Sequence, residues 1–188
     1  MVVNLENPLK EGGDQQGVVA FAGKRDKRQR VEKVGCVTFY IEKSGFGGKI
    51  IGWESSEPIN HIEIPSLGFI CLGISDECID GTDIESITLP RDKEDIFLYS
   101  DYNYTRVKKI IIPKQAKCFK KSGIFRDEAL GDLREIEFED PCGWGVDKNI
   151  IDDPEKMCDY VLRSCKNSQY GLTLKKTFLN RVRYWLGL

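Results

Sequence analysis

The chain has 188 residues, of which 40% are hydrophobic and 31% are charged, and these proportions are ordinary for a folded domain. A formal net charge of −2 at pH 7 does not favour a protein that binds nucleic acid or membranes over its whole surface. No run approaches about 18 consecutive apolar residues, so we expect no membrane-spanning helix. The first residues lack the basic and apolar regions of a secretory signal, so we expect no such signal.

Residues 1–33 are predicted to form a flexible N-terminus followed by a capping hairpin with a basic loop. Residues 1–16 are polar, whereas GVVAFAG at 17–23 has the composition of a strand. A charged loop at a hairpin tip is usually only solvated, and contact with phosphates or with an acidic protein surface is the alternative. The basic residues concerned are Lys24, Arg25, Lys27, Arg28 and Arg30.

One hydrophobic pattern, apolar-x-x-apolar-x-apolar, occurs five times, and successive starts are 25, 25, 23 and 26 residues apart. Its last positions alternate as in a strand, and β-branched residues dominate them. This period is too short for a strand with a full crossover helix, but it suits one coil of a solenoid. An antiparallel meander with accidental spacing is the alternative. The pattern starts at Val34, Ile59, Ile84, Val107 and Leu133.

The strand motif and its spacing resemble the leucine-rich repeat, in the BspA-like (Treponema-type) variant. Three repeats end in IEIP, ITLP and IIIP, at Pro65, Pro90 and Pro113, as strands of that variant do. Proline lacks an N–H and therefore closes a parallel ladder at the same point of each repeat. Tyr40 takes this place in the first repeat. The resemblance covers residues 34–141 and implies an α/β fold, a leucine-rich-repeat-like solenoid of about five coils with a parallel β-sheet on its concave face.

Residues 149–188 change period and are predicted to form a C-terminal helical cap on a solenoid that spans residues 34–148. Asp152 or Asp153 is the expected N-cap of a first helix, with Pro154 in its first turn. We expect two short helices to close the core, and a docking helix for another protein is the alternative. The expected apolar faces hold Met157, Val161, Leu162 and Cys165 in one helix, and Leu174, Phe178, Val182 and Trp185 or Leu186 in the other.

The sequence offers few groups for catalysis or metal binding. It has a single histidine, His61, and its seven cysteines include no CxxC pair, so no metal site is expected. We predict free thiols in a reducing cytoplasm, no cofactor and no enzymatic activity. A thiol enzyme that pairs Cys36 with His61 on adjacent strands is an alternative, although an exposed residue beside a surface thiol is the simpler interpretation.

Solenoids bind partners on their concave face, and we predict the partner-binding residues there. Lateral charge pairs, Glu85 with Lys108 and Lys109 with Glu135, account for much of the residue pattern on this face. Ile111 is an apolar residue at a solvent position and is the candidate centre of a contact patch. The predicted partner-binding residues are His61, Glu63, Glu85, Thr88, Lys108, Lys109, Ile111, Arg134 and Glu137.

The hypothesis from the sequence is a non-catalytic intracellular protein–protein interaction module that acts through the concave face. It would serve as an adaptor or as an inhibitor of a host or viral complex. We expect another protein as the partner and no membrane. The alternative is nucleic-acid binding through the basic loop at 24–33 and the basic C-terminal helix, with affinity that falls steeply as salt is added. That helix contributes Lys175, Lys176, Arg181 and Arg183.

Overall fold

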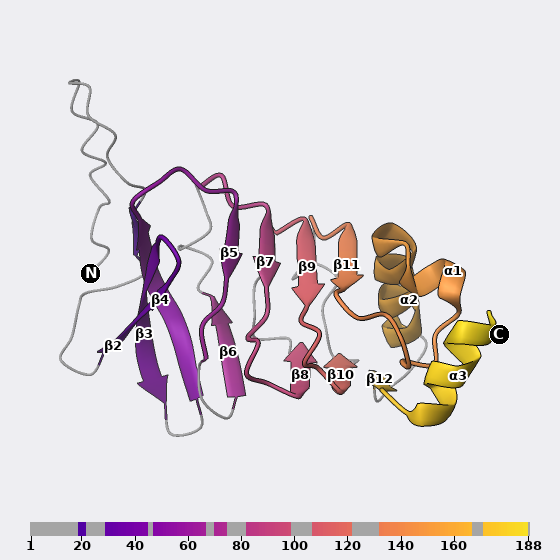
Figure 1. Ribbon diagram of the computed structural model, residues 1–188. Helices are drawn as coiled ribbons and strands as arrows, with labels where there is room; N and C mark the ends of the chain where they lie inside the picture. The colour runs from indigo at the N-terminus through magenta and orange to yellow at the C-terminus, as the bar shows by residue number, and fades with distance from the viewer. Residues whose placement is uncertain are drawn as a thin grey trace.

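The computed structural model of the chain describes eight stretches, which hold twelve β-strands and three α-helices (Figure 1). The strands form three small sheets. The described residues are 19–21, 29–44, 47–66, 70–74, 82–98, 107–121, 132–166 and 171–187.

The first sheet has five strands, in the order β1-β4-β3-β2, with β6 parallel to β4 and the other pairs antiparallel. A two-residue turn joins β2 to β3. Gly35 adopts φ +60° there, a conformation that residues with a side chain rarely adopt. Alternation along β3 buries Val37, Phe39 and Ile41. The strands are β1 (Val19–Phe21), β2 (Gln29–Val34), β3 (Val37–Ser44), β4 (Gly47–Ser55) and β6 (Ile70–Ile74).

The second sheet is parallel throughout and has the order β11-β9-β7-β5. Its register aligns one isoleucine from each strand, so a buried column crosses the sheet. The strands form at four of the five repeats, because β-branched alternation suits a strand with one buried face. They are β5 (His61–Glu63), β7 (Ser86–Thr88), β9 (Lys109–Ile112) and β11 (Glu135–Phe138), and the column is Ile62, Ile87, Ile110 and Ile136.

The third sheet consists of β8 (Asp95–Leu98), β10 (Cys118–Lys121) and β12 (Leu172–Lys175). Strands β8 and β10 are parallel, and β12 joins β10 in antiparallel orientation. Phe119 of β10 meets Phe138 of β11 edge to face, with 5.7 Å between the ring centroids. This contact joins the second and third sheets in one hydrophobic core.

The helices are α1 (Lys148–Ile151), α2 (Pro154–Lys166) and α3 (Phe178–Leu186). Helix α2 forms where the sequence predicts it, because Asp153 accepts a hydrogen bond from the Lys156 N–H and proline fits the first turn. Helix α2 packs against β11, and Cys158 and Cys165 are buried on it. Within the described stretches, no helix is long and apolar enough to cross a membrane.

The predicted solenoid of about five coils is wrong, because the fold is a mixed α/β arrangement of three small sheets and three helices. The first expected coil belongs to the first sheet, where β3 pairs with β2 and β4 in antiparallel orientation. Tyr40 keeps its N–H and lets β3 run on to Ser44, whereas β5, β7 and β9 stop close to Pro65, Pro90 and Pro113. The N-terminal hairpin is also wrong, because β1 and β2 lie on opposite edges of that sheet.

The C-terminal cap differs from its prediction as well. Leu174 lies in β12 and is buried there, so the second expected helix is divided into a strand and the shorter α3. None of the residues of α3 is buried, and Phe178, Val182 and Trp185 are exposed instead of closing the core. In Figure 1 the elements follow one another in a row, with β3 and β4 near one end and α3 at the other.

Candidate interaction surfaces

The parallel sheet brings most of the predicted partner-binding residues onto one face. Two rows of side chains cross it on the side opposite the isoleucine column. Glu85, Lys108 and Arg134 lie just before β7, β9 and β11, where the N–H of Lys108 donates to Glu85 O and that of Arg134 to Lys108 O, each at 2.8 Å. The rows are His61, Ser86, Lys109 and Glu135, and Glu63, Thr88, Ile111 and Glu137.

Charges on this face are largely paired with one another. Lys109 Nζ lies 2.6 Å from Glu137 and 3.2 Å from Glu135, and the hydrogen bond to Glu137 is the main cause that raises the pKa of Lys109. Lys108 Nζ lies 2.5 Å from Glu85. Exposed pairs of this kind contribute about 0.2–1 kcal/mol each to stability. The charges on this face therefore have a structural use already.

Arg91 links the two outer strands of this sheet, because it contacts Glu63 on β5 and Glu139 just after β11. Its guanidinium donates two hydrogen bonds of 2.7 Å to Glu139 and lies 3.0 Å from Glu63. The hydrogen bonds from Arg91 lower the pKa of Glu139. Ile111, the predicted centre of a contact patch, is only half-exposed, and its neighbour Thr88 is buried. These residues give the face no contiguous apolar patch.

His61 is held between two hydroxyl groups of β7. Its Nδ1 lies 2.8 Å from Ser86 Oγ, and its Nε2 lies 3.2 Å from Thr88 Oγ1. Cys36 lies in the β2–β3 turn, where its Sγ accepts a hydrogen bond from Ser55 Oγ at 3.6 Å. The predicted Cys36–His61 pair requires that the first two repeats form adjacent strands. Strands β3 and β5 instead belong to different sheets.

Burial lowers the pKa of His61 below its usual 6.5, helped by the positive charges of Arg91 and Lys109 and opposed by Glu63. As pH falls below 6.5, His61 is protonated in the unfolded chain but remains neutral in the folded protein. The free energy of unfolding therefore decreases as pH falls from 6.5 toward the lower pKa of folded His61. We therefore expect the wild-type protein to lose more stability between pH 7 and pH 5 than His61→Gln, measured by urea unfolding at both pH values. Equal losses would contradict this assignment, because the other titrating groups are common to both proteins.

The basic loop is only partly within the described residues. Lys24, Arg25, Lys27 and Arg28 lie outside them, and Arg30 on β2 pairs with Glu32 at 2.5 Å. No group of three or more His, Cys, Asp or Glu side chains in the described stretches could hold a metal ion.

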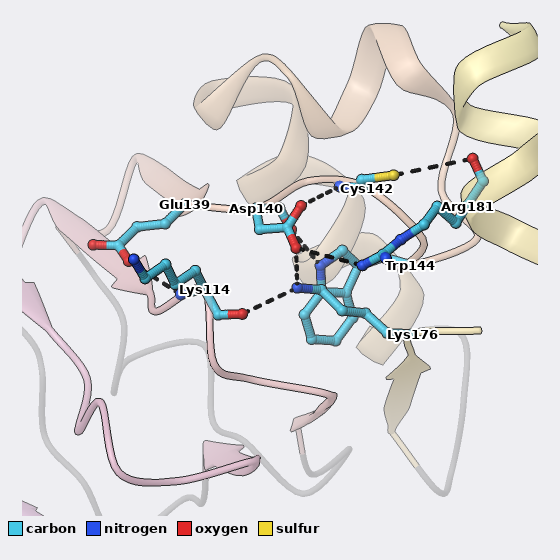
Figure 2. A network of polar contacts seen from close by, with 7 residues as sticks. All are labelled: Lys114, Glu139, Asp140, Cys142, Trp144, Lys176 and Arg181. Atoms are coloured by element: carbon cyan, nitrogen blue, oxygen red, sulfur yellow. Dashed lines mark hydrogen bonds and ion pairs between the residues drawn. The ribbon is translucent and has the colours of Figure 1, made fainter. Parts of the chain in front are cut away.

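Lys176 fixes the start of α3 to the body of the protein (Figure 2). Its ammonium donates to Asp140 Oδ2 at 2.7 Å and to the Lys114 carbonyl at 3.2 Å, and lies 5.1 Å from the Trp144 ring centroid. Its side chain is only 12% exposed. Thr177, the next residue, is the N-cap of α3, and its N–H donates to the Gly143 carbonyl at 3.0 Å.

The polar side of α3 continues this attachment. Tyr184 donates to Asp152 at 2.8 Å; burial and this hydrogen bond raise the pKa of Tyr184 to about 12, so the phenol stays a donor. Asn180 packs against Gly145, whose φ of +73° favours glycine and where an added Cβ would come within 2.5 Å of Asn180 Nδ2. Arg181 lies 3.9 Å from Asp140. Helix α3 is thus anchored through its polar residues.

The apolar face of α3 consequently points away from the body. At 100° per residue, its five large apolar side chains fall within about 120° of the helix circumference, and Asn180, Arg181 and Tyr184 lie outside that arc. Phe178 is 83% exposed and Trp185 is 75% exposed. The sequence periodicity predicted Phe178, Val182 and Trp185 or Leu186 on one stripe, but it placed that stripe against the core. The apolar face of α3 is Phe178, Leu179, Val182, Trp185 and Leu186.

A cleft of about 510 Å³ opens beside the first turn of α3. Its lining joins the segment before β10 with the residues that anchor the helix, and it includes four basic and two acidic side chains. Phe178 lines the same cleft, so the cleft borders the apolar face. The charged lining residues are Lys114, Lys117, Lys176, Arg181, Glu94 and Asp140.

The likeness to leucine-rich repeats rests on the strand motif and its spacing. Four repeats become the parallel strands β5, β7, β9 and β11, and the first repeat does not. Comparison with known protein families, with curated proteins and with solved structures finds no match, so no family is assigned to the chain.

Proposed function

We propose that this chain is a non-catalytic module that attaches to the surface of a lipid bilayer through α3. The observation that carries the proposal is the orientation of this helix, whose polar residues hold it to the body while five large apolar side chains face solvent. Amphipathic helices with Trp, Phe and Leu on one face lie in the membrane interface with that face buried.

Charge complementarity supports a bilayer as the occupant of this face. Residues 171–187, which hold β12 and α3, contain four basic side chains and no acidic one, whereas the rest of the chain holds 24 basic and 30 acidic residues. A membrane that contains anionic lipid offers an apolar layer beside a negative surface, and each nearby Lys or Arg contributes about 1 kcal/mol to binding.

Two other occupants are less well supported. A second copy of the chain would bring the arginines of two α3 helices together, and like charges repel. A groove on a partner protein usually contacts polar residues beside the apolar ones. Here Lys176, Asn180 and Tyr184 already contact the body of this protein. The sheet face is not proposed as a binding site, because its charges are paired with one another.

This proposal departs from the expectation that no membrane is involved. That expectation rested on the lack of a long apolar run, which matters for crossing a bilayer but not for lying on it. Nine residues make α3 about 13 Å long, so it would lie in the interface. Five cysteines whose side chains the structure describes form no disulfide bond, and the sequence favours free thiols in a reducing cytoplasm. We therefore place the chain on a cytoplasmic leaflet, where anionic lipids are found.

Tryptophan fluorescence of the full chain with added vesicles tests the proposal. Trp53 and Trp144 are already buried, so a blue shift on adding vesicles would report Trp185. We expect saturable binding to vesicles of about 70% phosphatidylcholine and about 30% phosphatidylglycerol. Phe178→Ser/Leu186→Ser should weaken it at least about 10-fold, because burying each side chain contributes about 1.5–3 kcal/mol.

Val31→Ser is the matched control, since Val31 is 56% exposed on β2, which belongs to the first sheet and not to α3. It should bind vesicles like the wild-type protein, and both variants should keep the wild-type melting temperature. The proposal fails if the wild-type chain does not bind, or if both variants bind equally well. Sedimentation velocity tests the alternative of a second copy. A wild-type dimer that is lost in Phe178→Ser/Leu186→Ser would show that the apolar face of α3 binds another copy of the chain instead.

A further inference from the structure

The cleft beside α3 lies where the headgroups of a bilayer would be. Phe178 is on the apolar face and also lines the cleft, so inserting this face into the acyl boundary brings the cleft mouth to the headgroup layer. Arg181 follows one helical turn later and lines the same cleft.

The charges of the lining leave the cleft net positive. Four basic and two acidic side chains give a net charge of +2. Glu94 is bound by Lys117 at 2.6 Å, whereas Asp140 is shared between Lys176 at 2.7 Å and Arg181 at 3.9 Å. One carboxylate thus faces two cations at the helix, and Lys114 adds a further cation to the lining.

These groups differ in how firmly they are held. Lys176 is nearly buried and serves the fold, while the Arg181 side chain is 54% exposed, and Lys114 is an exposed residue. Because the exposed Lys117 is paired with Glu94, an anion in the cleft would meet Arg181 and Lys114 first. Arginine and lysine are the side chains that proteins use to bind phosphate groups.

From this arrangement we infer that the cleft binds the phosphate-bearing headgroup of an anionic phospholipid and thereby selects anionic over zwitterionic membranes. This inference rests on the proposed attachment of α3 to a bilayer. Attachment through the apolar face alone would not distinguish the two kinds of lipid, whereas the cleft does.

The test compares two pairs of charge-neutralising substitutions on two kinds of vesicle. Lys114→Gln/Arg181→Gln changes the cleft, and Lys175→Gln/Arg183→Gln removes the same charge from exposed positions outside its lining. Vesicles of phosphatidylcholine alone are compared with vesicles that also contain phosphatidylglycerol. We expect the wild-type chain to bind anionic vesicles at least about 10-fold more tightly, with the cleft variant losing most of that preference and the control variant losing clearly less of it. Both variants should bind neutral vesicles like the wild-type protein and melt at its temperature.

Three outcomes would overturn the inference. Equal binding of the wild-type chain to both vesicles would leave membrane attachment intact but remove the lipid selection. Equal losses in the two variants would assign the preference to diffuse attraction between a basic surface and the membrane. Saturable binding of inorganic phosphate below about 1 mM, measured by calorimetry without vesicles, would show a site for a free anion instead of a lipid. A chain that binds neither vesicle would contradict the proposed function itself.

Discussion

Replacing Trp144 by alanine should lower the free energy of unfolding by about 3–5 kcal/mol, the usual cost of removing a buried tryptophan. The ring is buried, lies edge to face with Phe138 at a centroid distance of 4.8 Å, and carries Lys176 Nζ over its face. Its N–H also donates to the Asp140 carbonyl at 2.9 Å. Urea unfolding monitored by far-ultraviolet circular dichroism measures the loss.

The same substitution should loosen α3, because Lys176 packs on the lost ring just before the helix begins. Hydrogen exchange at α3 amides should therefore be faster in Trp144→Ala than in the wild-type protein. Trp144→Phe is the matched control, because it keeps most of the packing and loses one hydrogen bond, at a cost of about 1–2 kcal/mol. A loss below about 1 kcal/mol for Trp144→Ala would show that this residue does not join α3 to the core.

Neighbouring residues of β9 should differ sharply in their contribution to stability. Ile110 is fully buried in the isoleucine column, between Ile87 and Ile136. Ile110→Ala should cost about 2–5 kcal/mol, because it leaves a cavity that the surrounding sheets fill only in part. Ile111 is half-exposed on the opposite face, and Ile111→Ala should cost less than about 1 kcal/mol. Urea unfolding of both variants gives the comparison.

This pair also tests the register of the parallel sheet. A shift of one residue would exchange the two faces of β9 and turn Ile111 into the core. Similar costs for the two substitutions, or the larger cost at Ile111, would therefore contradict the observed pairing of β9 with β7 and β11. Vesicle binding should be unchanged in Ile111→Ala, since the proposed membrane contact lies on α3.

Elements whose cause is local can be predicted from the sequence. Alternating β-branched residues before Pro65, Pro90 and Pro113 predict strands, because each strand needs only one buried face and a place to stop. Asp153 and Pro154 predict the start of α2 for a similarly local reason. The cysteines Cys158 and Cys165 share one face of α2 because they lie seven residues apart, about two helical turns.

The neighbours of these elements depend on contacts between residues that are distant in the sequence. The first repeat has the same apolar pattern as the others, but Phe39 and Ile41 are buried in an antiparallel sheet instead. An apolar pattern predicts which side chains are buried, but it does not predict which strand lies beside them. The order β1-β4-β3-β2 was therefore not readable from residues 17–44.

The candidate membrane surface shows the same division. Helical spacing predicts that Phe178, Val182 and Trp185 share one face of a helix. It does not say whether that face turns inward, because the answer depends on partners distant in the sequence. Asp152 holds Tyr184, and Gly145 leaves room for Asn180, so the polar side of α3 faces the body. The apolar side, on the opposite side of the helix from these contacts, is exposed.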